Sequence, residues 1–123
     1  MMAWTVLFHD DFEAEFDELP RAVGDELLAH AKLLAEFGPQ LGRPRVDKVK
    51  GSRFPNMKEL RFYAADGVWR VAFAFDLKRQ AILLVAGDKA GVSEKRFYKQ
   101  LIEKADSRFD EYSATLKRKG GRS

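Results

Sequence analysis

Residues 58–64 and 68–76 alternate in polarity, and this alternation constrains the fold more than any other feature of the chain. Successive residues of a β-strand point to opposite faces of a sheet, so a period of two is typical of strands. Asp66-Gly67 lies between the two segments and is a strong signal for a tight hairpin turn. The pattern therefore predicts a hairpin with one apolar face that packs on a core, formed by Leu60, Phe62, Trp69, Val71, Phe73 and Phe75.

The opposite face of the predicted hairpin carries charged side chains from Glu59, Arg61 and Arg70. Ala72 and Ala74 share this face and are small, so they leave space above the sheet. We therefore expect an open sheet face that bears arginines, and such a face suits the binding of a polyanion.

The two parts of the chain differ strongly in charge. Residues 1–40 hold nine acidic and two basic residues, a net charge of −7, whereas residues 41–123 hold 20 basic and 10 acidic residues, a net charge of +10. This asymmetry favours a nucleic acid or another acidic partner for the second part of the chain. An ordinary solvated surface of mixed charge is the alternative interpretation.

The first third of the chain has the signals of a strand followed by two helices. Residues 4–8 form a short apolar run, and the spacing of apolar residues from 12 to 37 predicts a helical hairpin. Gly38-Pro39 ends the second helix. Residues 38–57 are rich in glycine and proline, and we expect them to form a long loop.

The last third predicts a buried strand and a long helix. Residues 80–87 are apolar at nearly every position, as expected for a strand that is covered on both faces. Ser93 can cap a final helix. An apolar stripe follows along that helix, formed by Phe97, Leu101, Ala105, Phe109, Tyr112 and Leu116. Together the elements predict an α+β fold with a twisted, mostly antiparallel sheet, an N-terminal helical hairpin on one side and a C-terminal helix.

Length and composition exclude several classes of protein. At 123 residues we expect one domain over residues 1–123, and no apolar run approaches the ~20 residues needed to span a bilayer. No basic segment precedes the first apolar stretch, so we expect no signal peptide. The chain has no cysteine, and His9 and His30 show no ligand spacing. These features predict a cytoplasmic protein that needs neither a metal nor a cofactor.

The order of the elements, together with a series of short motifs, resembles the RelE/ParE superfamily of bacterial toxins, and in particular its HigB-type, phage-derived branch. The motifs are FPNMKELR at 54–61, WRVAF at 69–73, LLVAGDK at 83–89, FY at 97–98 and AD at 105–106. The resemblance spans nearly the whole chain. It implies a RelE-like fold and a small mRNA endonuclease that acts on the ribosome. It also implies a cognate antitoxin, of the helix-turn-helix type, that inhibits the toxin.

Arg70 and Lys89 are the first candidates for catalysis. Arg70 matches the position of an active-site arginine in the family's strand motif, and a guanidinium can stabilise the negative charge of a phosphorane. The alternative is a structural arginine paired with Glu59 or Asp76. Lys89 follows the third strand, where the family carries a basic residue. It would bind the scissile phosphate or protonate the leaving oxygen, or else be an exposed turn lysine.

Tyr98, Glu59 and Arg61 complete the predicted catalytic set. Tyr98 is either a proton donor, a surface on which a base stacks, or an aromatic residue at the edge of the core. Glu59 is either a general base or the structural partner of Arg61 or Arg70. Because no histidine follows His30, proton transfer in an RNA-cleaving enzyme would use lysine, tyrosine, glutamate or water, and we expect the isolated protein to depend on the ribosome.

The expected loop carries a cluster of basic residues that suits contacts with an RNA backbone, with a solvated loop as the alternative. The cluster consists of Arg43, Arg45, Lys48, Lys50, Arg53 and Lys58. We also expect it to attract an acidic element of the antitoxin. Since one fold can serve several functions, two other functions stay open: inhibition of DNA gyrase in the manner of ParE, without catalysis, and an inactive relative.

Overall fold

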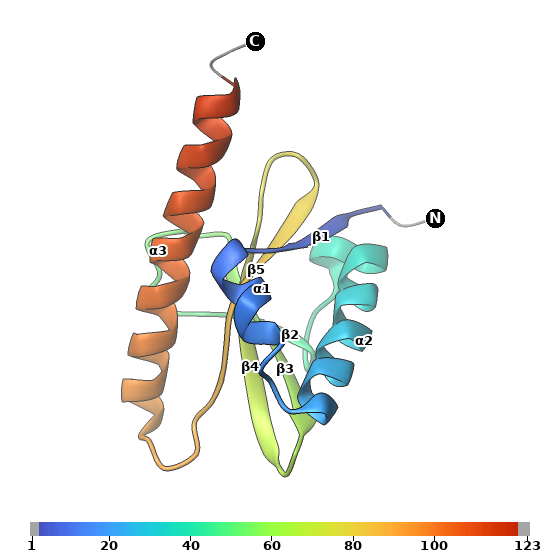
Figure 1. Ribbon diagram of the computed structural model, residues 1–123, viewed down its shortest axis with the longest axis vertical. Coiled ribbons are helices and arrows are strands. Elements are labelled where there is room, and N and C mark those ends of the chain that lie inside the picture. Colours follow the sequence, from blue (N-terminus) through green and yellow to red (C-terminus); the bar gives the residue numbers. More distant parts are fainter. Residues whose placement is uncertain (1–2, 121–123) are drawn as a thin grey trace.

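The computed structural model describes residues 3–120, with side chains through residue 116, as an open sheet flanked by helices (Figure 1). The strands are β1 Thr5–Phe8, β2 Val46–Lys48, β3 Met57–Ala64, β4 Gly67–Phe75 and β5 Gln80–Asp88. The helices are α1 Asp10–Phe16, α2 Arg21–Phe37 and α3 Glu94–Gly120, with a short 3-10 helix at Gly38–Gln40. In the part of the chain that the structure describes, no helix is long and apolar enough to cross a membrane.

The sheet has the strand order β1-β5-β4-β3-β2 and is antiparallel except for the parallel pair β1 and β5. The predicted α+β fold with a mostly antiparallel sheet is therefore confirmed. The β3–β4 turn lies one residue earlier than predicted, because Ala64 pairs with Gly67 across the turn. Its central residues, Ala65 and Asp66, both have positive φ (50° and 61°), as a two-residue hairpin turn of type I′ requires.

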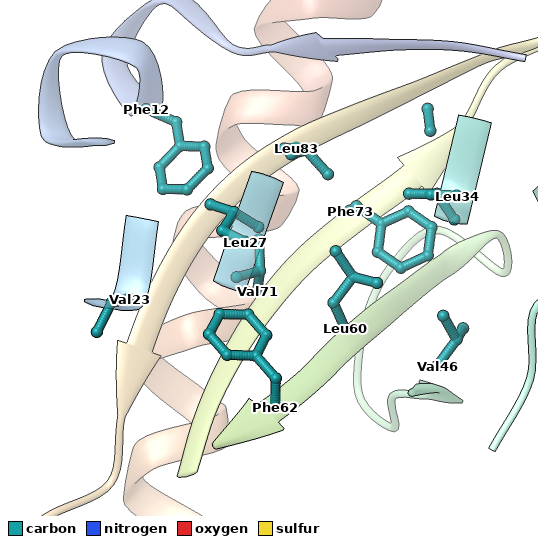
Figure 2. Packing of buried hydrophobic residues seen from close by; sticks show 11 residues of the cluster. Phe12, Val23, Leu27, Leu34, Val46, Leu60, Phe62, Val71, Phe73 and Leu83 are labelled. Carbon is teal, nitrogen blue, oxygen red and sulfur yellow. The ribbon is translucent and has the colours of Figure 1, made fainter. Parts of the chain in front are cut away.

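Helices cover both faces of the sheet. Helices α1 and α2 pack on one face, where the apolar side of the hairpin meets Phe12, Leu27 and Leu34 as Figure 2 shows. Helix α3 packs on the other face, over Ala72 and Ala74. The prediction of an open second face is therefore wrong. In Figure 1 α3 stands on the left of the sheet and α2 on the right, and the last turns of α3 extend beyond the sheet.

The small residues on the second face make room for α3. Ala72 and Ala74 are fully buried beneath it, in a cluster with Leu101 and Ala105. Gly87 lies on β5 at the same interface, and a Cβ atom there would lie 3.1 Å from Cε1 of Phe97. The alanines that seemed to leave open space thus allow the close approach of a helix, as small side chains do at packed interfaces.

The expected loop at residues 38–57 contains a strand that the sequence did not reveal. Val46 of β2 pairs with Leu60 and is buried, although β2 has only three residues. Further along the segment, Asp106 of α3 accepts hydrogen bonds from the Arg53 amide at 2.8 Å and from the Ser52 hydroxyl. Because Asp106 is itself buried, this segment is fixed against α3.

Candidate functional site

Four of the predicted catalytic residues meet where β3 and β4 pass under the first turns of α3. Glu59 and Arg61 lie on β3, and Arg61 pairs directly with Arg70 of β4. Tyr98 reaches this point from α3, because its neighbour Phe97 anchors the helix to the sheet beside Gly87. The sheet register and the helix packing together bring the four side chains into contact.

The Tyr98 hydroxyl is the centre of this cluster. It donates to the Glu59 carboxylate, at 2.6 Å from Oε1 and 2.8 Å from Oε2. It accepts hydrogen bonds from Nε of Arg70 at 2.8 Å and from Nη2 of Arg61 at 3.1 Å. A tyrosine hydroxyl has one proton and two lone pairs, so these contacts use its full hydrogen-bonding capacity. The arrangement fixes the phenol without a bound ligand.

Burial separates the members of the cluster. Glu59 is 2% exposed, and this burial raises the pKa of its carboxyl despite the hydrogen bond from Tyr98 and the two arginines. Burial also raises the pKa of Tyr98, and the hydrogen bond to Glu59 adds to this effect. The Arg61 side chain is 41% exposed. Its hydrogen bond to Tyr98 raises the pKa of its guanidinium, so Arg61 is the permanently charged group that faces solvent.

Arg70 does not face solvent, in contrast to the sequence prediction. It is 5% exposed, because the rings of Phe97 and Tyr98 lie over its guanidinium at 5.4 and 5.7 Å. A second hydrogen bond, from Nη1 to the Val68 carbonyl at 3.3 Å, also holds the guanidinium in place. The sequence predicted correctly which face of the sheet carries Arg70. Because α3 covers that face, however, Arg70 contacts Tyr98 and holds it in place.

A groove of about 760 Å³ runs between the β2–β3 segment and the first half of α3, and Glu59, Arg61 and Tyr98 line it. We call it the Tyr98 groove. Its charged residues balance, with five basic against five acidic side chains along its walls. The basic members are Lys48, Lys50, Arg61, Lys95 and Lys99, and the acidic members are Asp47, Glu59, Glu94, Glu103 and Asp106.

Lys95 and Lys99 are groove residues that sequence reasoning missed. They lie on α3 at a spacing of four, on either side of Tyr98 in the chain, and both are exposed. Residues four apart share a helix face, so this spacing around a candidate tyrosine was the available signal.

The predicted basic cluster does not form one continuous patch. Lys48 and Lys50 line the Tyr98 groove, whereas Arg43 forms an ion pair with Asp47 at 3.2 Å. Arg53 forms ion pairs with Asp106 and Asp110 and stacks on Phe54, its guanidinium 5.3 Å from the ring centre. Arg45 is exposed and holds Arg61 in place through a backbone hydrogen bond of 2.8 Å.

Two further candidates lie away from the groove lining. The Lys58 ammonium lies 5.6 Å from the ring centre of Phe75, which packs against the α1–α2 side of the sheet. Lys89 is exposed in the turn after β5 and is not among the residues that line the Tyr98 groove. The structure therefore brings together Glu59, Arg61, Arg70 and Tyr98, but not Lys89.

Both histidines make defined contacts in the structure. His9 caps α1, because its Nδ1 accepts a hydrogen bond from the Asp11 amide at 3.1 Å. Its Nε2 lies 3.1 Å from Glu111, so three potential metal ligands cluster here. Since Nδ1 acts as the acceptor, the ring proton resides on Nε2 and points at Glu111, which opposes metal binding through Nε2. His30 packs on Phe62 and is structural.

Solved structures of RelE proteins share this fold. The chain aligns with a double mutant of the toxin RelE from E. coli in its free state, with a TM-score of 0.59 and 15% identity over 84% of this chain and 97% of the other. It also aligns with an archaeal RelE–RelB complex from Pyrococcus horikoshii, with a TM-score of 0.51 and 23% identity over 74% of this chain and 100% of the other. The architecture is therefore RelE-like.

Sequence relatives define the family more closely. Residues 14–110 match the family of phage-derived Gp49-like proteins. Two relatives from Mycobacterium tuberculosis are named as candidate toxins, HigB3 and HigB2. HigB3 is 54% identical over 68% of this chain and 70% of its own length, and HigB2 is 45% identical over 78% of this chain and 48% of its own length. The chain thus belongs to the Gp49-like family, whose relatives here are named as HigB toxins, and it has a RelE-like fold.

Proposed function

We propose that this chain is a ribosome-dependent endoribonuclease that cleaves mRNA in the cytoplasm without a metal, as the toxin of a toxin–antitoxin pair. The family, whose relatives are named as toxins, supports the toxin role. The match to an archaeal RelE–RelB complex supports a cognate antitoxin as partner, for which we propose a helix-turn-helix protein encoded nearby. The RNA-cleaving chemistry rests on the side chains of the Tyr98 groove.

The observation that carries this proposal is the exposed guanidinium of Arg61 above a buried network. Attack of a ribose 2′-hydroxyl on the adjacent phosphorus builds negative charge on a phosphorane, which a preorganised arginine stabilises. Among the described residues, only Nη2 of Arg61 has hydrogen-bond or ion-pair partners, so Nε and Nη1 are free to bind phosphate oxygens. Arg61 is therefore our choice for the group that contacts the scissile phosphate.

The network beneath Arg61 offers a route for the proton. When a phosphate engages Arg61, the longest hydrogen bond to the Tyr98 oxygen, 3.1 Å, is released and a lone pair becomes free. The 2′-hydroxyl then gives its proton to Tyr98 while Tyr98 gives its own proton to Glu59, whose raised pKa suits a base. The 2′-oxygen attacks phosphorus, a 2′,3′-cyclic phosphate forms, and the 5′-oxygen leaves.

The leaving 5′-oxygen takes a proton from a lysine ammonium or from water. Lys95 and Lys99 line the Tyr98 groove, so they are better situated for this step than Lys89. Arg70 has a different role in this proposal. Its guanidinium is buried and holds the phenol of Tyr98 in place, so it is a positioning residue and does not contact RNA.

The balanced charge of the groove supports dependence on the ribosome. Five acidic side chains offset the five basic ones, so the groove gains little from releasing counterions of free RNA. The ribosome would present an ordered mRNA and so hold the reacting groups in the right geometry. Such orientation lowers the activation barrier by roughly 7–11 kcal/mol in the best intramolecular cases. Free mRNA would bind this groove weakly and in many orientations.

Mapping of RNA 5′ ends tests the proposal. We would incubate the purified chain with naked mRNA and with programmed ribosomes carrying the same mRNA. We expect new 5′ ends only on ribosomes, and their loss in Tyr98→Phe, which removes the hydroxyl that links Arg61 to Glu59. The exposed Arg96→Ala variant lies outside the groove lining and serves as the matched control. Equal cutting of both substrates would contradict ribosome dependence, and no cutting of either would contradict the nuclease.

A further inference from the structure

We propose that a second groove, at the opposite edge of the sheet, binds a basic, amphipathic segment of a partner protein. This inference rests on the proposed function in one respect, namely that the partner is the antitoxin. The groove has a volume of about 870 Å³ and lies between β1, α1 and the C-terminal part of α3. We call it the acidic groove.

The acidic groove has an apolar lining of side chains that are only partly covered. Val6 and Phe8 come from β1, Phe16 from α1 and Leu116 from α3. Leu28 of α2 also lines it and is 46% exposed. In Figure 1 the last turns of α3 extend past the sheet and beyond α1. An apolar surface of this kind gains free energy when a partner covers it.

The charges around this apolar lining all have one sign. Among the described residues that line the groove, five are acidic and none is lysine or arginine: Asp10, Asp11, Glu13, Asp17 and Glu111. A cluster of acidic residues alone would not indicate a ligand, but here it surrounds an apolar lining. A segment that fits both features has apolar side chains on one side and lysine or arginine beside them.

The backbone of β1 adds hydrogen-bonding capacity to the groove. β1 is an edge strand that pairs with β5. Thr5 and His9 donate their amides to carbonyls on the β5 side, at 3.1 and 2.9 Å. Because alternate residues of a strand direct their backbone groups to opposite sides, those of Val6 and Phe8 point to the outer edge. An extended segment of the partner can pair with this edge.

The occupant is therefore an extended segment in which apolar residues alternate with basic ones. The basic sign separates this surface from the Tyr98 groove, whose mixed charge fits no such peptide. This proposal differs from the sequence-based expectation, in which an acidic element of the antitoxin binds the basic loop. Under our proposal the antitoxin binds the acidic edge and leaves Arg61 and Tyr98 uncovered.

Fluorescence anisotropy with a defined peptide tests the inference on the full chain. The probe is a labelled peptide of about ten residues, a common strand length, in which leucine and lysine alternate. Its matched control replaces each lysine with glutamate. We expect the lysine peptide to bind and the glutamate peptide to fail. The double variant Asp17→Lys/Leu28→Ser should weaken binding by about tenfold or more, because it removes one exposed apolar contact and reverses one charge.

A second double variant keeps the comparison specific. Glu103→Lys/Leu77→Ser changes an acidic residue of the Tyr98 groove and a leucine that is fully exposed elsewhere. It should bind the lysine peptide as the wild type does. Equal affinity for the two peptides, or equal loss in the two double variants, would overturn the proposal. A chain that forms a dimer in sedimentation and loses it in Leu28→Ser would also overturn it, since the occupant would then be a second copy.

The readout separates this inference from the proposed nuclease. Asp17→Lys/Leu28→Ser should still cut mRNA on ribosomes, because neither residue lines the Tyr98 groove. The same variant should escape neutralisation by the antitoxin in cells that express both proteins. Peptide binding without cleavage would refute the nuclease alone, and cleavage without peptide binding would refute the docking surface alone.

Discussion

The two grooves use charge in opposite ways. In the Tyr98 groove the acidic Glu59 is buried, it accepts a hydrogen bond from Tyr98 and pairs with Arg61, and Arg70 holds Tyr98 in turn. In the acidic groove the carboxylates of α1 lie exposed around an apolar lining. Charge held in a buried network is preorganised and suits chemistry, whereas exposed charge around an apolar surface suits the steering and orientation of a partner.

Helix α3 links the two regions, since its first half lines the Tyr98 groove and its later turns line the acidic groove. Arg108 fixes the helix between them. It is buried, and its guanidinium donates to both carboxylate oxygens of Glu15 on α1, at 2.9 and 2.6 Å, and to the Leu84 carbonyl of β5 at 2.7 Å. The hydrogen bonds from Arg108 lower the pKa of Glu15. This contact ties α3 to the sheet and to α1.

The largest effect that separates the grooves is expected from Arg61→Ala. Loss of one preorganised donor to a developing charge typically costs a factor of about 100–1000 in rate. Because the Arg61 side chain is partly exposed, the fold should remain, and binding of the leucine-lysine peptide at the other edge should not change. Single-turnover cleavage at saturating ribosome measures the rate, with circular dichroism as the control for folding. Cleavage at the wild-type rate would show that the Tyr98 groove is not the active site.

Arg70→Ala should act on stability as well as on cleavage. Its buried guanidinium donates to Tyr98 and to Val68, and charge-assisted hydrogen bonds of this kind contribute about 1.5–3 kcal/mol. We expect the free energy of unfolding to fall by about 2–3 kcal/mol in a denaturant titration, with reduced cleavage because Tyr98 is no longer held. Arg96→Ala is the exposed control and should change little. An Arg70→Ala protein of wild-type stability would mean that Arg70 does not support the network.

Glu59→Gln should separate the proton route from the packing. Because the pKa of Glu59 is raised above 4.5 in the folded protein, the protonated carboxyl stabilises the fold, and that contribution is lost as pH rises through the folded-state pKa. Wild type and variant should therefore differ least in stability below pH 4.5 and most near neutral pH, where the variant is favoured. Denaturant titrations across this range measure the difference. Cleavage should fall, since glutamine cannot take the proton of Tyr98.

A stability difference with the opposite slope would contradict the proposed role of Glu59. If wild type gained stability relative to Glu59→Gln as pH rose, the folded-state pKa would be lowered and the carboxylate would be a salt-bridge partner of Arg61 and Arg70. Cleavage by Glu59→Gln at the wild-type rate would remove it from the proton route while leaving the packing argument intact.

The alternation of polar and apolar residues correctly predicted the strands of the sheet. It did not predict that a helix covers the second face. The alternation around Arg70 gave the correct strands and the correct parity, because the period of two depends only on the backbone. Whether a face is covered depends on a segment distant in the chain. Ala72 and Ala74 suit an open surface and a close helix equally, and only the apolar stripe of α3 decides between them.

The members of the site were easier to predict than their roles. Glu59, Arg61, Arg70 and Tyr98 do meet, but the buried position of Arg70 follows from Phe97 and Tyr98 lying over it. The strand within residues 38–57 also could not be predicted from the local sequence. A three-residue strand beside a basic run has no clear sequence signal, and it is held in register by pairing with β3. Tertiary contacts decided these points.

The smallest expected effect concerns the basic residues of that segment. Lys50 lines the Tyr98 groove, whereas Lys58 packs over Phe75 toward the other side of the sheet. Each phosphate contact contributes about one unit to the dependence of log affinity on log salt concentration. Lys50→Ala should therefore lower this slope by about one unit for binding to programmed ribosomes, uniformly across mRNA sequences, while Lys58→Ala leaves it unchanged. Titrations between low and physiological salt measure both slopes. If the two variants lower the salt slope by equal amounts, the basic residues attract RNA through their summed charge and not through contacts at defined positions. The contrast between a defined RNA groove and an acidic docking edge would then weaken.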